Sequence, residues 1–174
     1  AIRRGSSGTT MRYVAPQSRW SPTRMNGTSI GTCQVANDND PGQVVLSGSK
    51  RAIDRAVTLS KGHGVRRAVL LDVSAPFHSA LMQPAAEVMA KALAEVTIRV
   101  PAVPLVANVV AAPISDPEDI RRRLVEQVTG TVRWRDCVLR MAADGVTDTY
   151  EIGAGKVLSG LAKRIVGSLV TYSV

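Results

Sequence analysis

From residue 43 onward, the pattern of apolar and polar residues predicts strands and helices that alternate along the chain. Residues 43–48, QVVLSG, form a short β-branched run that predicts a strand. Residues 49–61 carry apolar side chains on one helical face, and residues 65–74 form a second apolar run. Strand, helix and strand in succession predict a β-α-β unit.

The same alternation continues to the carboxyl end. A nearly continuous apolar run at residues 103–110, bounded by prolines, predicts a strand buried on both faces of a parallel sheet. Strands that alternate with helices predict a parallel α/β fold. The spacing of apolar residues predicts helices over residues 79–96, 116–128, about 132–143 and 154–166, and a strand over residues 146–153.

Residues 1–32 differ from the rest of the chain. They are rich in Ser, Thr, Gly, Arg and Pro and show neither the helical nor the strand period. A segment of this composition does not bury enough apolar surface to offset the entropy lost on ordering. We therefore expect an atypical leader that is disordered or loosely packed.

Composition narrows the class of protein. A chain of 174 residues with 45% hydrophobic and 21% charged residues is typical of a globular domain, and no apolar run reaches the roughly 18 residues of a membrane span. The two cysteines, Cys33 and Cys137, build no metal-ligand or disulfide pattern. We therefore expect no metal and a reducing, cytoplasmic location.

The net charge of +8 suggests nucleic acid as a partner, but the distribution of charge argues against it. Residues 1–37 hold five arginines and no acid, while residues 38–174 hold 17 basic residues against 14 acids. The second segment thus carries only +3, without a basic stripe interleaved with aromatic residues. We expect neither nucleic acid nor a membrane as a partner.

His78 is the first candidate for chemistry. It follows the carboxyl end of the strand predicted at residues 65–74, where open α/β sheets place their binding sites. An imidazole takes a proton from a hydroxyl and returns it within one turnover, which is the behaviour of a general base. The alternative is a structural histidine beside an apolar run.

Five segments, in order, carry a specific resemblance. They include VSAPFHSALMQPAA around His78 and YEIGAGKVLSGLAKRI near the carboxyl end. Together they resemble the malonyl-CoA:acyl carrier protein transacylase family of fatty acid biosynthesis over roughly residues 33–170, the carboxyl-terminal part of that family's catalytic domain. Related polyketide synthase acyltransferases share the adjacent phenylalanine and histidine that stand here at Phe77 and His78. The five segments span residues 36–48, 73–86, 103–109, 125–136 and 150–165.

The resemblance implies an acyltransferase with a ping-pong mechanism. A serine takes the malonyl group from malonyl-CoA and passes it to the phosphopantetheine thiol of acyl carrier protein, so the enzyme needs no cofactor of its own. The resemblance also implies a partial hydrolase-like parallel sheet core with the remnant of an inserted ferredoxin-like subdomain. We expect the leader at residues 1–32, the second half of the small subdomain at 33–73, and the carboxyl-terminal part of the catalytic core at 74–174.

The family's motifs also imply site residues. His78 matches the catalytic base, and Gln127 matches the residue whose backbone carbonyl orients that base. The alternative for Gln127 is an ordinary residue at the end of a helix. The residues that match the wall of the acyl pocket are Asn37, Asn39, Gln43 and Phe77. For the first three the alternative is a turn before a strand, and for Phe77 it is packing into the core.

The family's nucleophile is not identified in this chain. The family carries it in a GHSxGE motif, and no such motif occurs here. Ser29 lies in GTSIG, which matches GxSxG, but the sequence predicts no buried strand before it and no helix after it, so we interpret it as a decoy. Two alternatives to an enzyme therefore stay open: a non-catalytic fragment that binds acyl carrier protein or acyl-CoA, and a truncated product with a partial fold.

Two further motifs have ordinary structural interpretations. GAGK at residues 153–156 lacks the spacing of a phosphate loop and predicts a strand-to-helix turn. Three arginines at residues 121–123 lie on a predicted helix as a solvated face, with a docking site for the acidic carrier protein as the alternative. Finally, a partial sheet predicts exposed strand edges and apolar faces.

Overall fold

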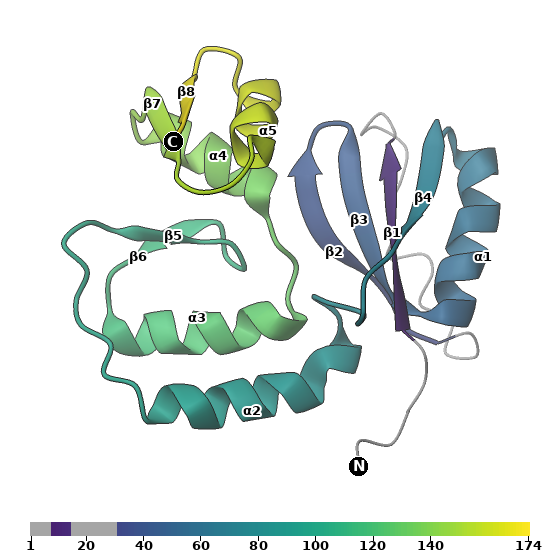
Figure 1. Ribbon diagram of the computed structural model, residues 1–174, viewed down its shortest axis with the longest axis horizontal. Helices are drawn as coiled ribbons and strands as arrows, with labels where there is room; N and C mark the ends of the chain where they lie inside the picture. Colours follow the sequence, from purple (N-terminus) through teal and green to yellow (C-terminus); the bar gives the residue numbers. More distant parts are fainter. Residues whose placement is uncertain (1–7, 15–30) are drawn as a thin grey trace.

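The computed structural model describes residues 8–14 and 31–174, and within these ranges the fold is mixed α/β, as the sequence predicts (Figure 1). Three parts follow one another along the chain. We call residues 8–14 and 31–71 the sheet region and residues 134–174 the carboxyl-terminal region. A pair of helices with a small hairpin lies between them in the sequence.

The sheet region contains four strands in the order β2-β3-β1-β4, and each neighbouring pair is antiparallel. The parallel sheet predicted from the alternation of strands and helices is therefore wrong for this region, because that alternation does not show which strands become neighbours. Helix α1 connects β3 to β4 and packs against β1 and β3. Because β3 and β4 are both antiparallel to β1, they run parallel to each other, so the predicted β-α-β unit is present with β1 between its strands. The elements are β1 (Gly8–Val14), β2 (Cys33–Asp40), β3 (Gln43–Ser49), α1 (Lys50–Ser60), the 3₁₀ helix η2 (Lys61–His63) and β4 (Arg67–Leu71).

An apolar core forms between this sheet and α1. Met11 of β1, Leu46 of β3, and Ile53 and Ala56 of α1 are at most 1% exposed and belong to one cluster. Ile53 and Ala56 lie three positions apart, so both point from the same face of the helix toward the sheet. The helical spacing in the sequence therefore identified the buried face of α1.

Strand β1 lies in the segment for which we expected no regular structure. That expectation is wrong for residues 8–14, which pair with β3 on one side and β4 on the other. Thr10 and Met11 are buried, and the hydroxyl oxygens of Thr10 and Ser47 lie 3.3 Å apart. The pattern missed this strand because it is short and acquires its order from distant partner strands.

Helices α2 (Gln83–Ala94) and α3 (Pro117–Thr129) lie side by side, and the 3₁₀ helix η3 (Ala80–Met82) leads into α2 (Figure 1). The start of α3 follows from its sequence. The side chain of Asp116 accepts a hydrogen bond from the backbone N–H of Asp119 at 2.8 Å, and proline occupies the first helical position. Both helices agree with the sequence-based prediction.

The long buried strand expected at residues 103–110 is wrong. Two short strands, β5 (Leu105–Ala107) and β6 (Ala112–Ile114), form an antiparallel hairpin instead. The chain turns between them, with the backbone N–H of Ala111 donating to the carbonyl oxygen of Ala107 at 2.8 Å. An apolar run does not distinguish one long strand from two short strands joined by a tight turn, which explains the error.

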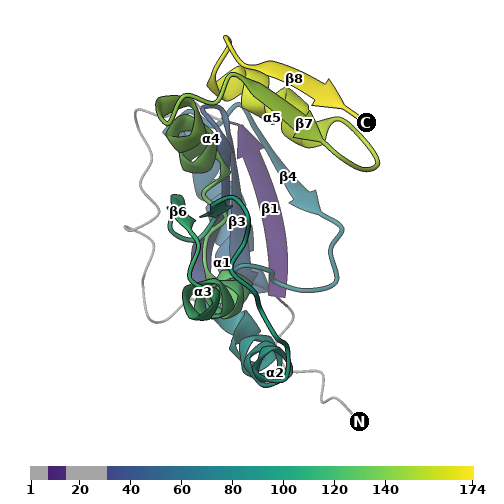
Figure 2. The same ribbon diagram turned by 90° about the vertical axis from the view of Figure 1, so that its left-hand side faces the viewer.

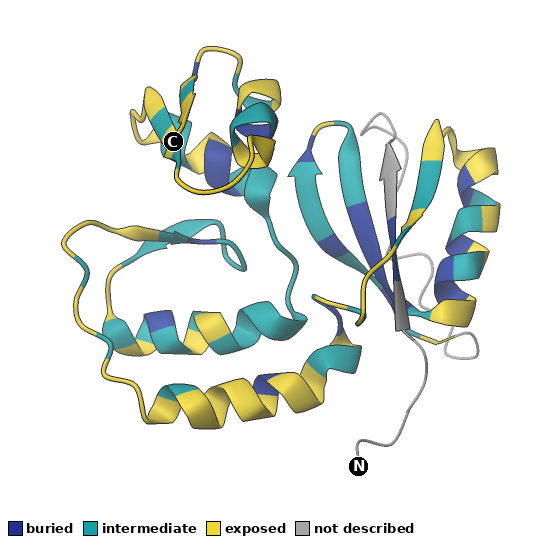
Figure 3. Cartoon of the chain, in the orientation of Figure 1, coloured by how far each residue is buried: buried dark blue, intermediate teal, exposed yellow. Residues whose placement is uncertain are grey.

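The carboxyl-terminal region contains a parallel strand pair and two helices. They are α4 (Trp134–Ala143), β7 (Asp148–Glu151), α5 (Val157–Ile165) and β8 (Val170–Ser173), of which β8 was not predicted. Val138, Ala162 and Leu169 form a small buried cluster. Much of the surface of β7, α5 and β8 is exposed (Figure 3), so the apolar faces that we expected to be uncovered do occur here.

Strand β2 of the sheet region contacts helices α4 and α5 of the carboxyl-terminal region, which lie at one end of the sheet (Figure 2). The guanidinium of Arg164 lies 2.8 Å from the buried carboxylate of Asp40, and that of Arg135 lies 2.7 Å from Asp38. Burial raises the pKa of Asp38, and the charge of Arg135 opposes that rise. Two ion pairs therefore connect the edge strand to the two helices.

No helix in the described residues is long and apolar enough to cross a membrane. Over the same ranges, no group of His, Cys, Asp and Glu side chains lies close enough together to hold a metal ion.

Candidate active site

His78 lies in a tight turn between β4 and η3, which we call the His78 turn (residues 72–79). The hydroxyl of Ser79 donates to the carbonyl oxygen of Pro76 at 2.7 Å, and the backbone N–H of Met82 donates to the carbonyl oxygen of Ser79 at 2.9 Å. His78 has a φ of 56°, a left-handed conformation that costs a non-glycine residue of order 1–3 kcal/mol. The hydrogen bonds of the turn hold it in this conformation.

The imidazole of His78 contacts the end of α3. Its Nδ1 lies 2.8 Å from the backbone carbonyl oxygen of Gln127. A carbonyl oxygen only accepts, so Nδ1 carries the proton and donates it, and Nε2 of the neutral ring keeps its lone pair. The structure thus brings together the two residues that the resemblance paired, although their catalytic roles stay a prediction.

The carbonyl of Gln127 is able to accept this bond because α3 ends at Thr129. The last carbonyl groups of a helix have no partner within the helix. Gly130 makes the close packing at this end possible: a Cβ at this position would lie 2.7 Å from Cγ2 of Val109 and 2.9 Å from the carbonyl oxygen of Glu126. The side-chain amide of Gln127 also donates to the carbonyl oxygen of Gly130 at 3.0 Å. The backbone carbonyl and the side-chain N–H of Gln127 are therefore both engaged at the helix end.

The residues expected to line the acyl pocket lie on the β2–β3 hairpin and in the His78 turn. Asn37 and Asn39 are half-buried on β2, and Gln43 is half-buried at the start of β3. Within the described residues, no hydrogen bond joins the side chain of Asn37 or Asn39 to His78. Phe77 is 43% exposed, which does not fit core packing as its sole role. A pocket role for all four residues stays a prediction.

The described residues offer no evident nucleophile, and Ser29, interpreted as a decoy, lies outside them. Cys33 and Cys137 are both buried and free. Burial raises the pKa of each thiol, that of Cys137 to about 11. Such thiols stay protonated at neutral pH and are poor nucleophiles.

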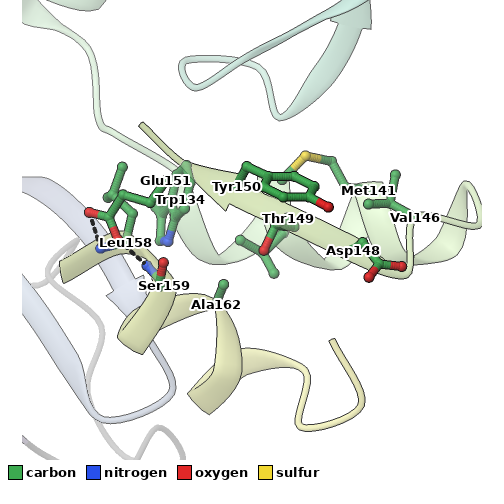
Figure 4. Close-up of a pocket in the computed structure, with 11 residues that line it drawn as sticks. Trp134, Met141, Val146, Asp148, Thr149, Tyr150, Glu151, Leu158, Ser159 and Ala162 are labelled. Carbon is green, nitrogen blue, oxygen red and sulfur yellow. Dashed lines mark hydrogen bonds between the residues drawn. The ribbon is translucent and has the colours of Figure 1, made fainter. Parts of the chain in front are cut away.

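The GAGK motif forms the turn between β7 and α5, as predicted, with its two glycines at positive φ. The carboxylate of Glu151 accepts hydrogen bonds from the backbone N–H groups of Leu158 at 3.1 Å and Ser159 at 2.8 Å (Figure 4). These N–H groups belong to the first turn of α5, where a phosphate loop would bind its anion. Because a carboxylate of the chain occupies them, the turn is structural.

A pocket of about 300 Å³ lies between α4, β7 and α5 (Figure 4). Its lining is mainly apolar, and Nε1 of Trp134 is buried there without a hydrogen-bond partner among the described residues. None of the residues expected in the site lines this pocket. Gln127 instead borders a second pocket of about 150 Å³, together with Asn108 and Arg123.

The three consecutive arginines of α3 are paired with acids of the same helix. Arg121 pairs with Glu118, and Arg122 and Arg123 both pair with Asp119. Pairs at this spacing are typical of a solvated helix face. Arg122 is exposed, as a solvated face predicts, whereas Arg121 and Arg123 are half-buried, and a docking role for these arginines stays a prediction.

Sequence reasoning missed two polar side chains that contact the frame of the site. The side-chain oxygen of Gln34 accepts a hydrogen bond from the backbone N–H of Ala80 at 2.6 Å. The hydroxyl of Thr131 donates to the carbonyl oxygen of Val35, also at 2.6 Å. These bonds join residues that are 46 and 96 positions apart, so no local pattern pointed to them.

Known proteins resemble this chain in both sequence and fold. Residues 11–164 match a family model described as the acyl transferase domain. The malonyl CoA-acyl carrier protein transacylase of Haemophilus influenzae is 47% identical over 140 residues, which cover 80% of this chain and 45% of that protein. The crystal structure of an acyl-carrier-protein S-malonyltransferase from Bartonella henselae has a TM-score of 0.88 at 45% identity, covering 97% of this chain and 54% of that chain.

A second similar structure is a malonyl-transacylase in complex with a type II polyketide synthase acyl-carrier protein, with a TM-score of 0.88 at 35% identity over 97% of this chain and 55% of that chain. This chain thus spans about half the length of the proteins that it matches. The family model matches from residue 11, so the match includes part of β1. It therefore begins earlier in the chain than residue 33, where the motifs placed the start of the resemblance. Because the family model matches most of its residues, the chain belongs to the acyl transferase domain family.

Proposed function

We propose that this chain forms part of an enzyme that transfers a malonyl group from malonyl-CoA to the phosphopantetheine thiol of acyl carrier protein in fatty acid biosynthesis. Its 47% identity to the Haemophilus influenzae transacylase supports the substrates and the partner. The observation that carries the proposal is the 2.8 Å contact between Nδ1 of His78 and the carbonyl oxygen of Gln127, which leaves Nε2 as a base. We assign the serine nucleophile to a part of the fold that this chain does not span.

His78 acts twice in the proposed cycle. In the first half-reaction, its Nε2 takes the hydroxyl proton as the serine oxygen attacks the thioester carbon of malonyl-CoA; the C–S bond breaks, and His78 returns the proton to the coenzyme A thiolate. In the second, Nε2 takes the proton of the phosphopantetheine thiol, the sulfur attacks the ester carbon of malonyl-serine, the C–O bond to the serine breaks, and His78 returns the proton to the serine oxygen. The carbonyl of Gln127 accepts from Nδ1 throughout, because that nitrogen is protonated in both states of the ring.

We place the malonyl group beside the polar side chains of the β2–β3 hairpin and the ring of Phe77. The amide N–H groups of Asn37, Asn39 and Gln43 are suitable donors to a carboxylate or a carbonyl oxygen. Phe77 precedes His78 directly and is 43% exposed, which leaves its ring accessible to an acyl group. We infer that this ring crowds an α-methyl substituent and so favours malonyl over methylmalonyl.

We also assign the finer architecture. The strand order β2-β3-β1-β4, with α1 on the connection from β3 to β4, supports a ferredoxin-like small subdomain that includes β1. The parallel unit β7-α5-β8 supports the carboxyl-terminal part of a hydrolase-like core. The proposed substrates, malonyl-CoA and acyl carrier protein, favour a cytoplasmic location.

A fusion protein tests the base. The part of the Haemophilus influenzae transacylase that this chain does not match is joined to the chain, and malonyl transfer to the phosphopantetheine-bearing carrier protein is measured. We expect the fusion to be active and H78A to lower its kcat by about 10²- to 10⁴-fold. His63, which is exposed in η2, supplies the matched control, because H63A should keep the activity. An active fusion that H78A leaves unchanged would contradict the proposal.

The second candidate function is a non-catalytic module that binds acyl carrier protein or acyl-CoA. The absence of the GHSxGE motif from the chain favours it. The intact mass of the fusion protein after exposure to malonyl-CoA separates the candidates: a covalent malonyl adduct supports the enzyme, and carrier-protein binding by the chain with no adduct on the fusion supports the module. A further alternative is a relative of polyketide synthase acyltransferases. Faster malonyl transfer by the active fusion to a polyketide carrier protein than to one from fatty acid synthesis would support that alternative.

A further inference from the structure

Strand β2 is the outer strand of the sheet, and its free edge binds the segment that follows α3. The backbone N–H of Val132 donates to the carbonyl oxygen of Ala36 at 2.8 Å, and the N–H of Asp38 donates to the carbonyl oxygen of Val132 at 2.9 Å. The hydroxyl of Thr131 adds a third bond, to the carbonyl oxygen of Val35 at 2.6 Å. Three hydrogen bonds therefore fix the position of the chain just beyond the end of α3.

The same strand binds the other side of the site through a side chain. The Oε1 atom of Gln34 accepts from the backbone N–H of Ala80 at 2.6 Å. Ala80 begins η3 two residues after His78, and Ser79, at the N-cap of η3, makes no side-chain cap of its own. Gln34 thus supplies an acceptor for an N–H group that the start of a helix leaves without an intrahelical partner.

These contacts form a closed path of hydrogen bonds and short chain segments. It runs from Gln34 to Ala80, along the chain to His78, across to Gln127, along the chain to Thr131, and back to β2 at Val35, the residue next to Gln34. Two adjacent residues of one strand therefore hold both partners of the imidazole–carbonyl bond. A hydrogen bond of 2.8 Å weakens steeply when its partners move apart by less than 1 Å, so its geometry depends on this path.

We propose that Gln34 and Thr131 are positioning residues for His78, an inference that rests on the proposed function of His78 as the base. Gln34 holds the His78 turn, and Thr131 holds the carbonyl end of α3. Neither side chain touches the reacting atoms. Their effect is to keep Nδ1 of His78 on the carbonyl of Gln127 and hence to keep the neutral ring as the tautomer whose Nε2 accepts a proton.

The tautomer of His78 is the measurement that reports this effect. Two-bond ¹H–¹⁵N correlation spectra of the ¹⁵N-histidine-labelled 174-residue chain, at a pH where the imidazole is neutral, distinguish a ring protonated at Nδ1 from one protonated at Nε2. We expect the wild-type chain to show His78 protonated at Nδ1. We expect Q34A and T131V to convert that single pattern into a mixture of both tautomers, because a neutral ring that no acceptor fixes populates both.

Matched variants separate positioning from a general loss of structure. T131S keeps the hydroxyl and Q34E keeps the side-chain acceptor, so both should restore the single Nδ1 pattern. T129V is the control at the same helix end and should leave the pattern unchanged, because the hydroxyl of Thr129 donates to the carbonyl oxygen of Glu126 within its own helix, at 3.4 Å. The signal of His63 provides an internal reference in every spectrum.

The outcomes separate the positioning role of Gln34 and Thr131 from the proposed role of His78. A single Nδ1 pattern that persists in both Q34A and T131V overturns the positioning role while leaving His78 as the proposed base. A wild-type ring protonated at Nε2 removes the bond to Gln127 and contradicts the proposed function itself. If T131V loses the dispersion of its amide signals, Q34A decides, since Gln34 is half-buried and its bond to Ala80 is exposed to solvent.

Discussion

The sheet region and the carboxyl-terminal region bury their apolar surface to very different extents. In the sheet region, Leu46 and Ile53 are completely buried between the sheet and α1. In the carboxyl-terminal region, Ile152 is 85% exposed and Val157 is 69% exposed. The contrast is visible as dark blue in the sheet region and yellow around β7, α5 and β8 (Figure 3).

The difference follows from how the strands pair. An antiparallel sheet is stable with one covered face, and the sheet region supplies that cover with its own helix. Parallel strands are usually covered on both faces, and two strands alone make a marginal sheet. The rings of Tyr150 and Tyr172 stack with centroids 4.7 Å apart on the parallel pair, and Tyr150 is largely exposed. The parallel pair thus lacks cover, in a chain that spans 45% of its Haemophilus influenzae relative.

The largest effect is expected from truncating one isoleucine in each region. I53A should lower the free energy of unfolding by about 2–5 kcal/mol, because it leaves a cavity in the core of the sheet region. I152A should change it by no more than about 0.5 kcal/mol, because that side chain is already exposed. Urea denaturation followed by circular dichroism measures both. Equal losses would show that the two regions do not differ in burial as the structure indicates.

A pair of glycines gives an effect of intermediate size and opposite signs. G130A should destabilise the protein by about 1–3 kcal/mol, since its methyl group would overlap Val109 and the carbonyl of Glu126 at the end of α3. G160A should stabilise it by about 0.5–1 kcal/mol, because Gly160 lies within α5 and a Cβ there meets its nearest atom, in the Arg164 side chain, at 3.7 Å. Thermal unfolding of the two variants tests the signs, and stabilisation by G130A would disprove the close packing.

The smallest effect is expected at Glu151 and depends on pH. The backbone N–H of Ser159 lowers the pKa of Glu151, with a further contribution from Leu158. A lowered pKa in the folded state means that the carboxylate stabilises the fold above its unfolded-state pKa and loses this contribution as the pH falls through the folded value. E151Q should therefore unfold at a lower temperature than the wild type at neutral pH, and the difference should vanish in acid. E87Q, on an exposed part of α2, is the control; a difference for E151Q that persists unchanged into acid would refute the charge effect.

Local pattern predicted most of the helices because their determinants are local. The spacing of Ile53 and Ala56 identified the buried face of α1, and Asp116 with the following proline marked the start of α3. The pattern failed where order comes from distant partners. Strand β1 is held by β3 and β4. The pattern also failed for the apolar run at 103–110, which contains β5 and the turn that leads to β6, because such a run does not distinguish one long strand from a short strand followed by a turn.

The candidate site divides in the same way. His78 was found from its place after a strand, and its pairing with Gln127 came from the resemblance and not from spacing. Gln34 and Thr131 were missed, because an isolated glutamine and threonine carry no signal until the fold brings them to Ala80 and Val35. Contacts across long sequence separations are invisible to a pattern read over a dozen residues.

The sequence by itself determined the family resemblance, the positions of most helices and the choice of His78 as the candidate base, since these depend on motifs and on the period of apolar residues. Only the tertiary structure decided that β1 completes an antiparallel sheet, that Nδ1 of His78 reaches the carbonyl of Gln127, and that β2 binds both sides of that contact. The physical reason is that a hydrogen bond depends on positions to within a fraction of an ångström, and those positions are set by strand pairing and packing across the whole chain.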